Sequence, residues 1–202
     1  MTITKTNIVG KIRTAIDDIV PAAADSFTND TDKELWQATY HAVQSLLEEL
    51  PLRLLLPKAS SASAVATSDG GSTITLDSDF LKFVEVRLNT WKGTLSELMD
   101  PDSEEARRQR SPWSRGTAEK PKAMLDYSAS GALTLYCWPT GTRTILNYIP
   151  KASKNVADTE ISCAIRDEAE RYIIYRAASI FFEGKKETDI AAKFATLSTT
   201  IE

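Results

Sequence analysis

The sequence predicts an α+β protein: a helical bundle of about four helices with an inserted small antiparallel β-sheet or hairpin region. Two observations predict this class. Apolar residues recur at helical spacing near both ends of the chain, whereas the middle carries short alternating stretches separated by turn residues. We therefore expect N-terminal helices in residues 1–57, the β region in 58–150 and C-terminal helices completing the bundle in 151–202.

Length and composition are those of a globular protein. A chain of 202 residues, 42% hydrophobic and 26% charged, is expected to bury about 70% of the surface that its unfolded form exposes. No secretory signal and no apolar stretch long enough to cross a bilayer is present, so no membrane partner is expected. Cys137 is expected in a strand and Cys163 in a helix, both as buried reduced thiols, and no metal-ligand spacing or cofactor motif is found.

The first expected helix lies close to the N-terminus. Ile8, Ile12, Ile16 and Ile19 repeat at helical spacing. Pro21 follows directly and is expected to end the helix, because proline cannot donate a backbone hydrogen bond.

A second helix is expected from the pair Thr31 and Glu34, whose spacing is that of a capping box. One apolar stripe follows it: Trp36, Tyr40, Val43, Leu47 and Leu50. Residues 51–57 then form a short apolar segment between two prolines and lead into the β region. Residues 58–71 are rich in Ser, Ala and Gly and form either a flexible tether or a first strand near 64–67.

The next segment is expected to hold two strands. An apolar strand at 72–76 runs into a polar turn at 77–79, whose side chains are suited to bond nearby backbone amides. Residues 83–91 alternate with period two, which places Val84, Val86 and Leu88 on one face of a half-buried strand. A one-turn helix at 80–83 is an alternative for the start of this segment.

A β-hairpin is expected further along the chain. Its strands are residues 122–127 and 132–138, joined by a turn at 128–131. Residues 144–149 are expected to form a third strand, and three adjacent strands can share one sheet.

Two C-terminal helices complete the expected bundle. Asp158 or Thr159 is suited to cap a long helix at 160–183, and Gly184 is placed to stop it. The apolar face of this helix comprises Ile161, Ile165, Ala169, Tyr172, Ile173, Ala177, Ile180 and Phe181. A last helix at 187–198 has Ile190, Phe194 and Leu197 on one side.

A charged segment between the strands changes sign along its length. Acidic residues come first: Asp100, Asp102, Glu104 and Glu105. Pro101 is suited to open a short helix there, with the acids at its positive end. The candidate interaction site is the basic half that follows: Arg107, Arg108, Arg110, Trp113, Arg115 and Lys120.

Three interpretations of this basic half are open. It could pair with its own acidic half, contact an acidic protein surface, or stack and pair against single-stranded nucleic acid. Arg and Trp are the residues that anchor protein interfaces, so among the functional interpretations we favour contact with a neighbouring subunit or a partner protein.

The sequence shows no constellation of residues suited to catalysis. The single histidine, His41, is expected on the solvent-facing side of its helix, in line with Gln37, Gln44 and Glu48. No Gly-x-Ser-x-Gly elbow, phosphate-binding glycine loop or calcium-loop spacing is present. The sequence therefore predicts a protein that is not an enzyme, although an enzyme of unrecognised type is a further alternative. A net charge of −4 also argues against a protein whose main function is to bind nucleic acid.

Residues 72–184 carry a series of short motifs in a fixed order. They are the strand end and turn at 76–81, the strand at 84–91 ending in Trp91, Gly116 and Thr117 with Pro121, the pair Trp138 and Pro139, the Tyr148 to Pro150 strand end, and the long helix. This series resembles the head-to-tail connector proteins of tailed bacteriophages, the adaptor or ring proteins beneath the portal, including those of crAss-like phages. Asp77 stands where that family usually carries a proline.

The resemblance implies a virion structural protein at the head–tail junction, present in the host cytoplasm before assembly. Copies of the chain would form a ring, a dodecamer as that family implies, that docks on the portal protein and receives tail or next-ring proteins. Double-stranded DNA would pass through the lumen without sequence specificity. The alternative function is a nucleic-acid-binding accessory protein that uses the loop at residues 107–122.

Overall fold

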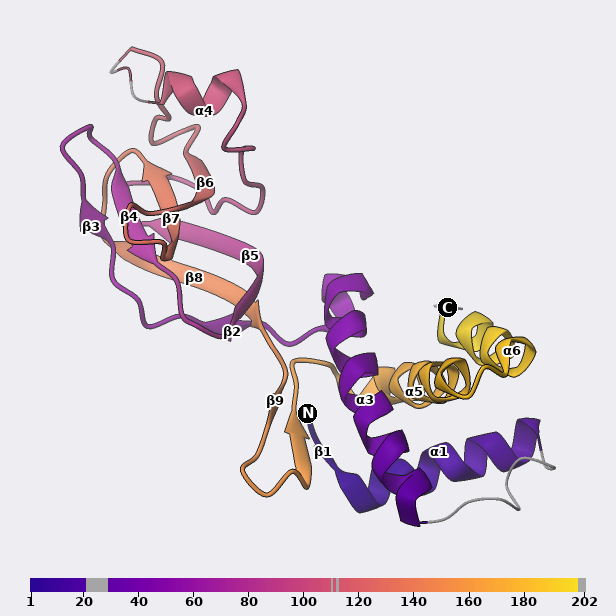
Figure 1. The fold of residues 1–202 in the computed structure, drawn as a ribbon. Helices are drawn as coiled ribbons and strands as arrows, with labels where there is room; N and C mark the ends of the chain where they lie inside the picture. The colour runs from indigo at the N-terminus through magenta and orange to yellow at the C-terminus, as the bar shows by residue number, and fades with distance from the viewer. Residues whose placement is uncertain (21–28, 110, 112, 200–202) are drawn as a thin grey trace. The chain divides into compact units, whose positions relative to one another are not determined.

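The computed structural model describes residues 1–20, 29–109, 111 and 113–199. Within them the chain has a mixed α/β fold with five α-helices and three small antiparallel sheets (Figure 1). Two compact units are formed, one from Met1–Leu56 with Lys151–Glu202 and the other from Pro57–Pro150. The mixed class is confirmed, but the chain contains more sheet than the predicted inserted hairpin region.

Among the described residues, four helices belong to the first unit: α1 (Lys5–Ile19), α3 (Asn29–Glu49), α5 (Glu170–Gly184) and α6 (Thr188–Thr199). The predicted stripe of α1 is confirmed, because Ile8, Ile12 and Ile16 are buried. This helix ends at Ile19, and Pro21, which was expected to stop it, lies outside the described residues.

Helix α3 carries the predicted apolar stripe but begins earlier than predicted. It already includes Asn29, so Thr31 lies in the first turn and not at the N-cap. The capping-box interpretation is therefore wrong for this residue. Trp36, Val43, Leu47 and Leu50 are buried, as the helical spacing predicted.

The predicted helix at 160–183 is wrong over its first ten positions. A small sheet with the order β1 (Thr2–Thr4), β10 (Glu160–Ser162) and β9 (Ser153–Lys154) occupies this part of the chain. Ile161 pairs with Ile3 in this sheet, and both side chains are buried. The four-residue spacing from Ile161 to Ala169 is thus satisfied by a strand, a bridge and a 3-10 turn rather than by a helix. Cys163 lies after β10 and not in a helix, although it is buried as predicted.

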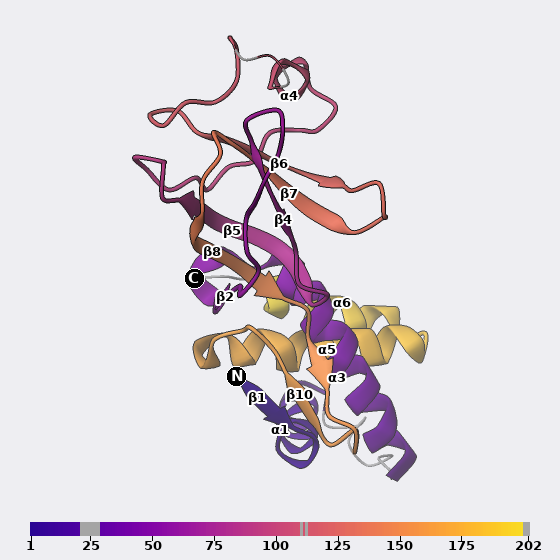
Figure 2. The same ribbon diagram turned by 90° about the vertical axis from the view of Figure 1, so that its left-hand side faces the viewer.

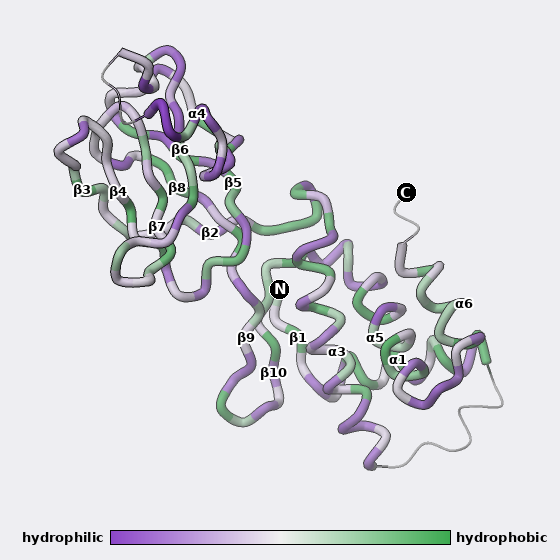
Figure 3. Tube along the Cα trace, turned by 45° about the horizontal axis from the view of Figure 1, so that its top comes forward, coloured by the Kyte–Doolittle hydropathy of each residue, from purple (hydrophilic) through white to green (hydrophobic). Residues whose placement is uncertain are grey.

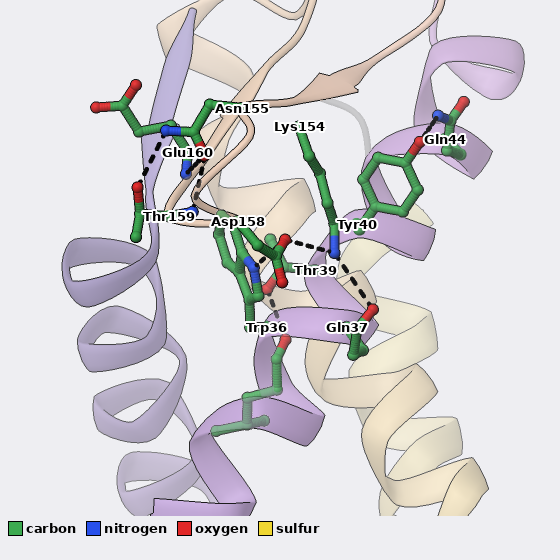
Figure 4. Close-up of polar contacts among 11 residues, drawn as sticks. Trp36, Gln37, Thr39, Tyr40, Gln44, Lys154, Asn155, Asp158, Thr159 and Glu160 are labelled. Atoms are coloured by element: carbon green, nitrogen blue, oxygen red, sulfur yellow. Dashed lines mark hydrogen bonds and ion pairs between the residues drawn. The ribbon is translucent and has the colours of Figure 1, made fainter.

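The turn between β9 and β10 is held against α3 by polar contacts (Figure 4). The Trp36 indole donates to Asp158 Oδ1 at 3.0 Å, and Lys154 Nζ lies 2.9 Å from the same oxygen. Lys154 also lies over the Tyr40 ring, 4.8 Å from its centroid. These contacts give this polar turn a defined conformation.

Helix α6 is confirmed, but its buried face differs by one position from the predicted one. Ala191, Phe194 and Ser198 are buried, whereas Leu197 is 39% exposed. The Phe194 ring stacks on Phe182 of α5 at 5.8 Å between centroids, which fixes the rotation of the helix.

The second unit contains two sheets that share one core (Figure 2). One sheet has the order β2 (Lys58–Ala59), β8 (Arg143–Pro150), β5 (Phe80–Leu88), and the other β3 (Val65–Ala66), β4 (Ser72–Thr75), β7 (Leu133–Trp138), β6 (Lys122–Tyr127). Their core is formed by Ile74, Val86, Leu88, Trp91, Ala123, Leu135, Cys137 and Leu146. Alternation predicted Val84, Val86 and Leu88 on one face of β5. Val86 and Leu88 are buried, but Val84 is only half-buried and Phe83 from the other predicted face packs against the core, next to a register shift between Phe83 and Glu85.

The predicted hairpin is confirmed as β6 and β7, but its third strand is not in the same sheet. Strand β7 is flanked by β6 on one edge and β4 on the other, so no edge is left for β8. Strand β8 pairs instead with β5 and β2. Strand β5 begins at Phe80, which excludes the one-turn helix, and residues 58–71 contain the short strands β2 and β3 in place of a tether.

Candidate functional site

The charged segment folds around a short helix, α4 (Glu104–Arg108). Ser103 caps it, because its Oγ accepts a hydrogen bond from Ala106 N at 3.1 Å. Two acids lie in the first turn and two arginines in the last, an arrangement that suits the helix dipole. A short helix was predicted here, but the cap is Ser103 and Pro101 lies before the helix. Figure 3 shows the stretch around α4 in purple, the colour of hydrophilic residues.

Gln109 connects the two ends of the loop. It is only 2% exposed, and its amide nitrogen donates to Glu105 O at 2.9 Å. Its carbonyl oxygen accepts from Gly116 N at 2.7 Å. A buried amide that uses both of its ends in this way holds the segment returning from the loop against α4.

Gly116 and Arg115 fix the returning segment on the sheet. A Cβ at Gly116 would lie 2.8 Å from Trp138 O and 2.9 Å from Lys122 N, so the backbones approach too closely for any side chain. The Arg115 guanidinium donates to the carbonyl of Asp69 and covers Gly70. The base of the loop is therefore built into the second unit.

Part of the basic half pairs with the acidic half, as one interpretation predicted. Arg108 lies 2.5 Å from Glu104, and Lys122 lies 2.6 Å from Glu105. Glu119 of the loop lies 2.7 Å from Lys92, whose hydrogen bond lowers the pKa of the Glu119 carboxyl. These exposed pairs order side chains and contribute little stability.

The remaining candidate residues face solvent. Trp113 is 97% exposed, and Arg107 and Lys120 are exposed with no ion-pair partner among the described residues. Arg110 lies outside the described residues. Of the six predicted residues, Arg108 and Arg115 are therefore held within the unit. The other described ones, Arg107, Trp113 and Lys120, are presented to solvent.

A cavity of about 500 Å³ lies against α4. Its charged lining comprises Glu104, Glu105, Arg108, Arg115, Lys120 and Lys122, and Gln109, Ser114, Gly116 and Thr117 complete the wall. The sequence predicted the basic residues but neither the cavity nor the role of Gln109. No local pattern marks Gln109, because its function depends on two backbone groups that only the folded loop brings together.

Other groups with possible chemistry lie apart from this loop. His41 is exposed on α3, as predicted, and Cys137 is buried in β7, where burial raises the pKa of its thiol to about 12. Among the described residues, no group of three His, Cys, Asp or Glu side chains could hold a metal ion. In the same part of the chain no helix combines the length and the apolar character that a membrane span requires.

No model of a known protein family matches this chain, and no curated protein matches its sequence.

Proposed function

We propose that this protein is a head-to-tail adaptor of a tailed phage, a virion structural protein that forms a ring beneath the portal and links the capsid to the tail. The observation that carries the proposal is Trp113. Its side chain is 97% exposed on a loop whose base is held by Gln109, Arg115 and Gly116. A large apolar side chain on an anchored loop is typical of a surface that is buried in an assembly.

The physical reason is the area that a tryptophan can bury. Trp side chains bury about 150–250 Å² each and are enriched, with arginine, among the residues that dominate interface energies. Arg107 and Lys120 of the same loop add exposed positive charge and lack ion pairs in the described part of the chain. A partner surface with an apolar centre could cover the Trp113 side chain, and acidic groups on it could pair with Arg107 and Lys120.

The resemblance of residues 72–184 to phage connector proteins gives this interface its context. In the proposal the helices at both ends of the chain form a bundle and the unit Pro57–Pro150 is its insertion. Copies join through heterologous contacts that close on rotation, with a dodecamer as the expected ring. Each copy has a net charge of −4, so a ring would be strongly negative and offer few phosphate contacts to the DNA that passes through its lumen.

The proposal is tested by mixing the purified chain with the portal protein encoded by the same genome. We expect a complex in size-exclusion chromatography with light scattering and rings in negative-stain images. Trp113→Ala should weaken the complex at least tenfold, because loss of an interface hot spot costs about 2 kcal/mol or more. Tyr127→Ala is the matched control, since Tyr127 is also exposed, at 69%, but lies on β6 outside the loop. A chain that stays monomeric beside the portal contradicts the proposal.

The alternative is a nucleic-acid-binding accessory protein, and one observation favours it. Arg107, Trp113 and Lys120 are all exposed, and such residues can stack on bases and neutralise phosphates. The acids around α4 oppose this function, because Glu104 and Glu105 already pair with Arg108 and Lys122, two cations that phosphates would need. Retention of labelled DNA at moderate salt, with an affinity that falls steeply as salt rises, would support the alternative over the adaptor.

A further inference from the structure

The cavity against α4 has more positive than negative charge. Four basic side chains and two carboxylates line it. The carboxylates of Glu104 and Glu105 are already paired with Arg108 and Lys122. The charges of Arg115 and Lys120 remain, because Arg115 donates to a backbone carbonyl and Lys120 has no ion pair among the described residues. The empty space of the cavity therefore lies in a positive field.

The backbone that carries the positive groups is ordered before any ligand binds. Lys120 N donates to Thr117 Oγ1 at 3.2 Å, and Thr117 N donates to Lys120 O at 3.1 Å, which closes a tight turn at the rim. Opposite this turn, Gln109 fixes Gly116 on α4. A site whose backbone is already ordered loses less conformational entropy when it binds a ligand.

An exposed aromatic surface lies next to the cavity in the chain. Ser114 is part of the wall, and its Oγ donates to Arg108 O at 2.8 Å. Its neighbour Trp113 is almost fully exposed. An occupant that places an acidic group in the cavity would thus find an indole surface for an adjacent apolar side chain.

We propose that this cavity binds a carboxylate side chain of a partner protein, with Lys120 and Arg115 as its cations and Trp113 packing on an apolar residue beside it. The inference rests on the proposed function and names the chemistry of the partner at the same interface. A single carboxylate meets only the two unneutralised cations. A nucleic-acid strand carries a phosphate at every nucleotide, which is more negative charge than these two cations can balance.

Three probes test this assignment on the full chain: a short synthetic peptide in which Glu alternates with Leu, the same peptide with Gln for Glu, and single-stranded oligothymidylate. Acrylamide quenching of tryptophan fluorescence reports binding at one position. Trp36, Trp91 and Trp138 are 1%, 2% and 3% exposed, so Trp113 supplies the quenchable emission. We expect the Glu peptide to protect Trp113 and the Gln peptide to protect it at least fivefold more weakly.

Substitutions then place the carboxylate in the cavity. Lys120→Gln should weaken binding of the Glu peptide about fivefold, as expected for loss of one partly exposed ion pair. Lys151→Gln removes an exposed lysine of the other unit and should leave the affinity unchanged. Both variants keep side chains of similar length at exposed positions, and an unchanged melting curve shows that each is folded.

Several results would overturn the inference. Equal binding of the Glu and Gln peptides would show that the cavity does not recognise a carboxylate. Tighter binding of oligothymidylate would identify nucleic acid as the ligand. An unchanged affinity in Lys120→Gln would place binding elsewhere. Peptide binding without a portal complex would reject the proposed function alone, and portal complexes that are indifferent to Lys120→Gln would reject this inference alone.

Discussion

At the scale of single residues, the turn after β4 shows how a polar group can connect distant strands. Asp79 lies 2.7 Å from Lys58 Nζ and accepts a hydrogen bond from Tyr148 Oη at 2.7 Å. Ser60 Oγ donates to the neighbouring Asp77 at 2.9 Å. The sequence predicted that these aspartates would bond nearby backbone amides. Their side chains instead join the turn to β2, β8 and the residue that follows β2.

Asp79 leads to a prediction about pH. Burial raises the pKa of its carboxyl, but hydrogen bonds from Lys58 and Tyr148 lower this pKa by more than burial raises it. The pKa of Asp79 therefore lies below its ordinary value. A folded-state pKa below the unfolded value of about 3.9 stabilises the fold above that pH, and the stabilisation is lost as the pH falls through the folded pKa. Asp79→Asn should therefore lower the free energy of unfolding at neutral pH and reduce its further loss in acid.

Urea denaturation between neutral pH and about pH 2.5 measures both effects. Glu97→Gln removes an exposed carboxyl of the same unit and should leave the profile close to wild type. An Asp79→Asn profile parallel to the wild-type profile would show that Asp79 does not carry this pH dependence. Tyr148 stays neutral throughout, because burial and the bond to Asp79 raise its pKa to about 12.

At the scale of elements, α6 shows how packing selects one face of an amphipathic helix. Helical spacing grouped Ile190, Phe194 and Leu197, but the contact with α5 buries Phe194 and leaves Leu197 39% exposed. Ser179 Oγ of α5 donates to Ala191 O at 3.1 Å, which favours the rotation that buries Ala191. Spacing alone tolerates either face, and the hydrogen bond and the stacked rings decide between them.

This packing predicts a large difference between two substitutions in one helix. Phe194→Ala should lower the free energy of unfolding by about 3–5 kcal/mol, because it leaves a cavity against Phe182. Leu197→Ala should change it by less than about 1 kcal/mol, since much of that side chain stays in water. Chemical denaturation followed by helical circular dichroism measures both values. Equal losses would mean that Leu197 is buried as deeply as Phe194 and that α6 has a different rotation about its axis.

At the scale of the whole molecule, the two ends of the second unit, Pro57–Pro150, lie close together. Lys58 of β2 pairs with Tyr148 of β8, so both ends of Pro57–Pro150 lie on one strand pair. That unit also has its own core around Leu135 and Val86. Neighbouring chain ends and a separate hydrophobic core are properties of a segment that can fold alone.

We therefore expect residues 57–150 to fold when expressed without the rest of the chain. The measurements are dispersed amide resonances and a cooperative thermal transition. Leu135→Ala should destabilise this fragment by about 2–5 kcal/mol, because Leu135 is fully buried on the central strand β7. A fragment with collapsed resonances and no transition would show that its stability depends on the other unit.

Sequence patterns were sufficient to predict the elements whose signal is local. Ile8, Ile12 and Ile16 on α1, the strands β6 and β7 and the end of α5 at Gly184 follow from spacing and from turn residues that lie within a few positions of each other. The mixed fold class follows from the same signals. The basic residues of the candidate site were also evident, because charge is a property of the residue itself.

The features that join distant residues became evident only in the folded chain. Strand β8 pairs with β5 because both edges of β7 are occupied, and Ile161 lies in a strand because Ile3 lies opposite it. Gln109 became part of the site because folding placed Glu105 O and Gly116 N at its two ends. Spacing along a chain fixes which side chains share a face, whereas the partner of that face depends on which edges and polar groups remain unsatisfied after folding.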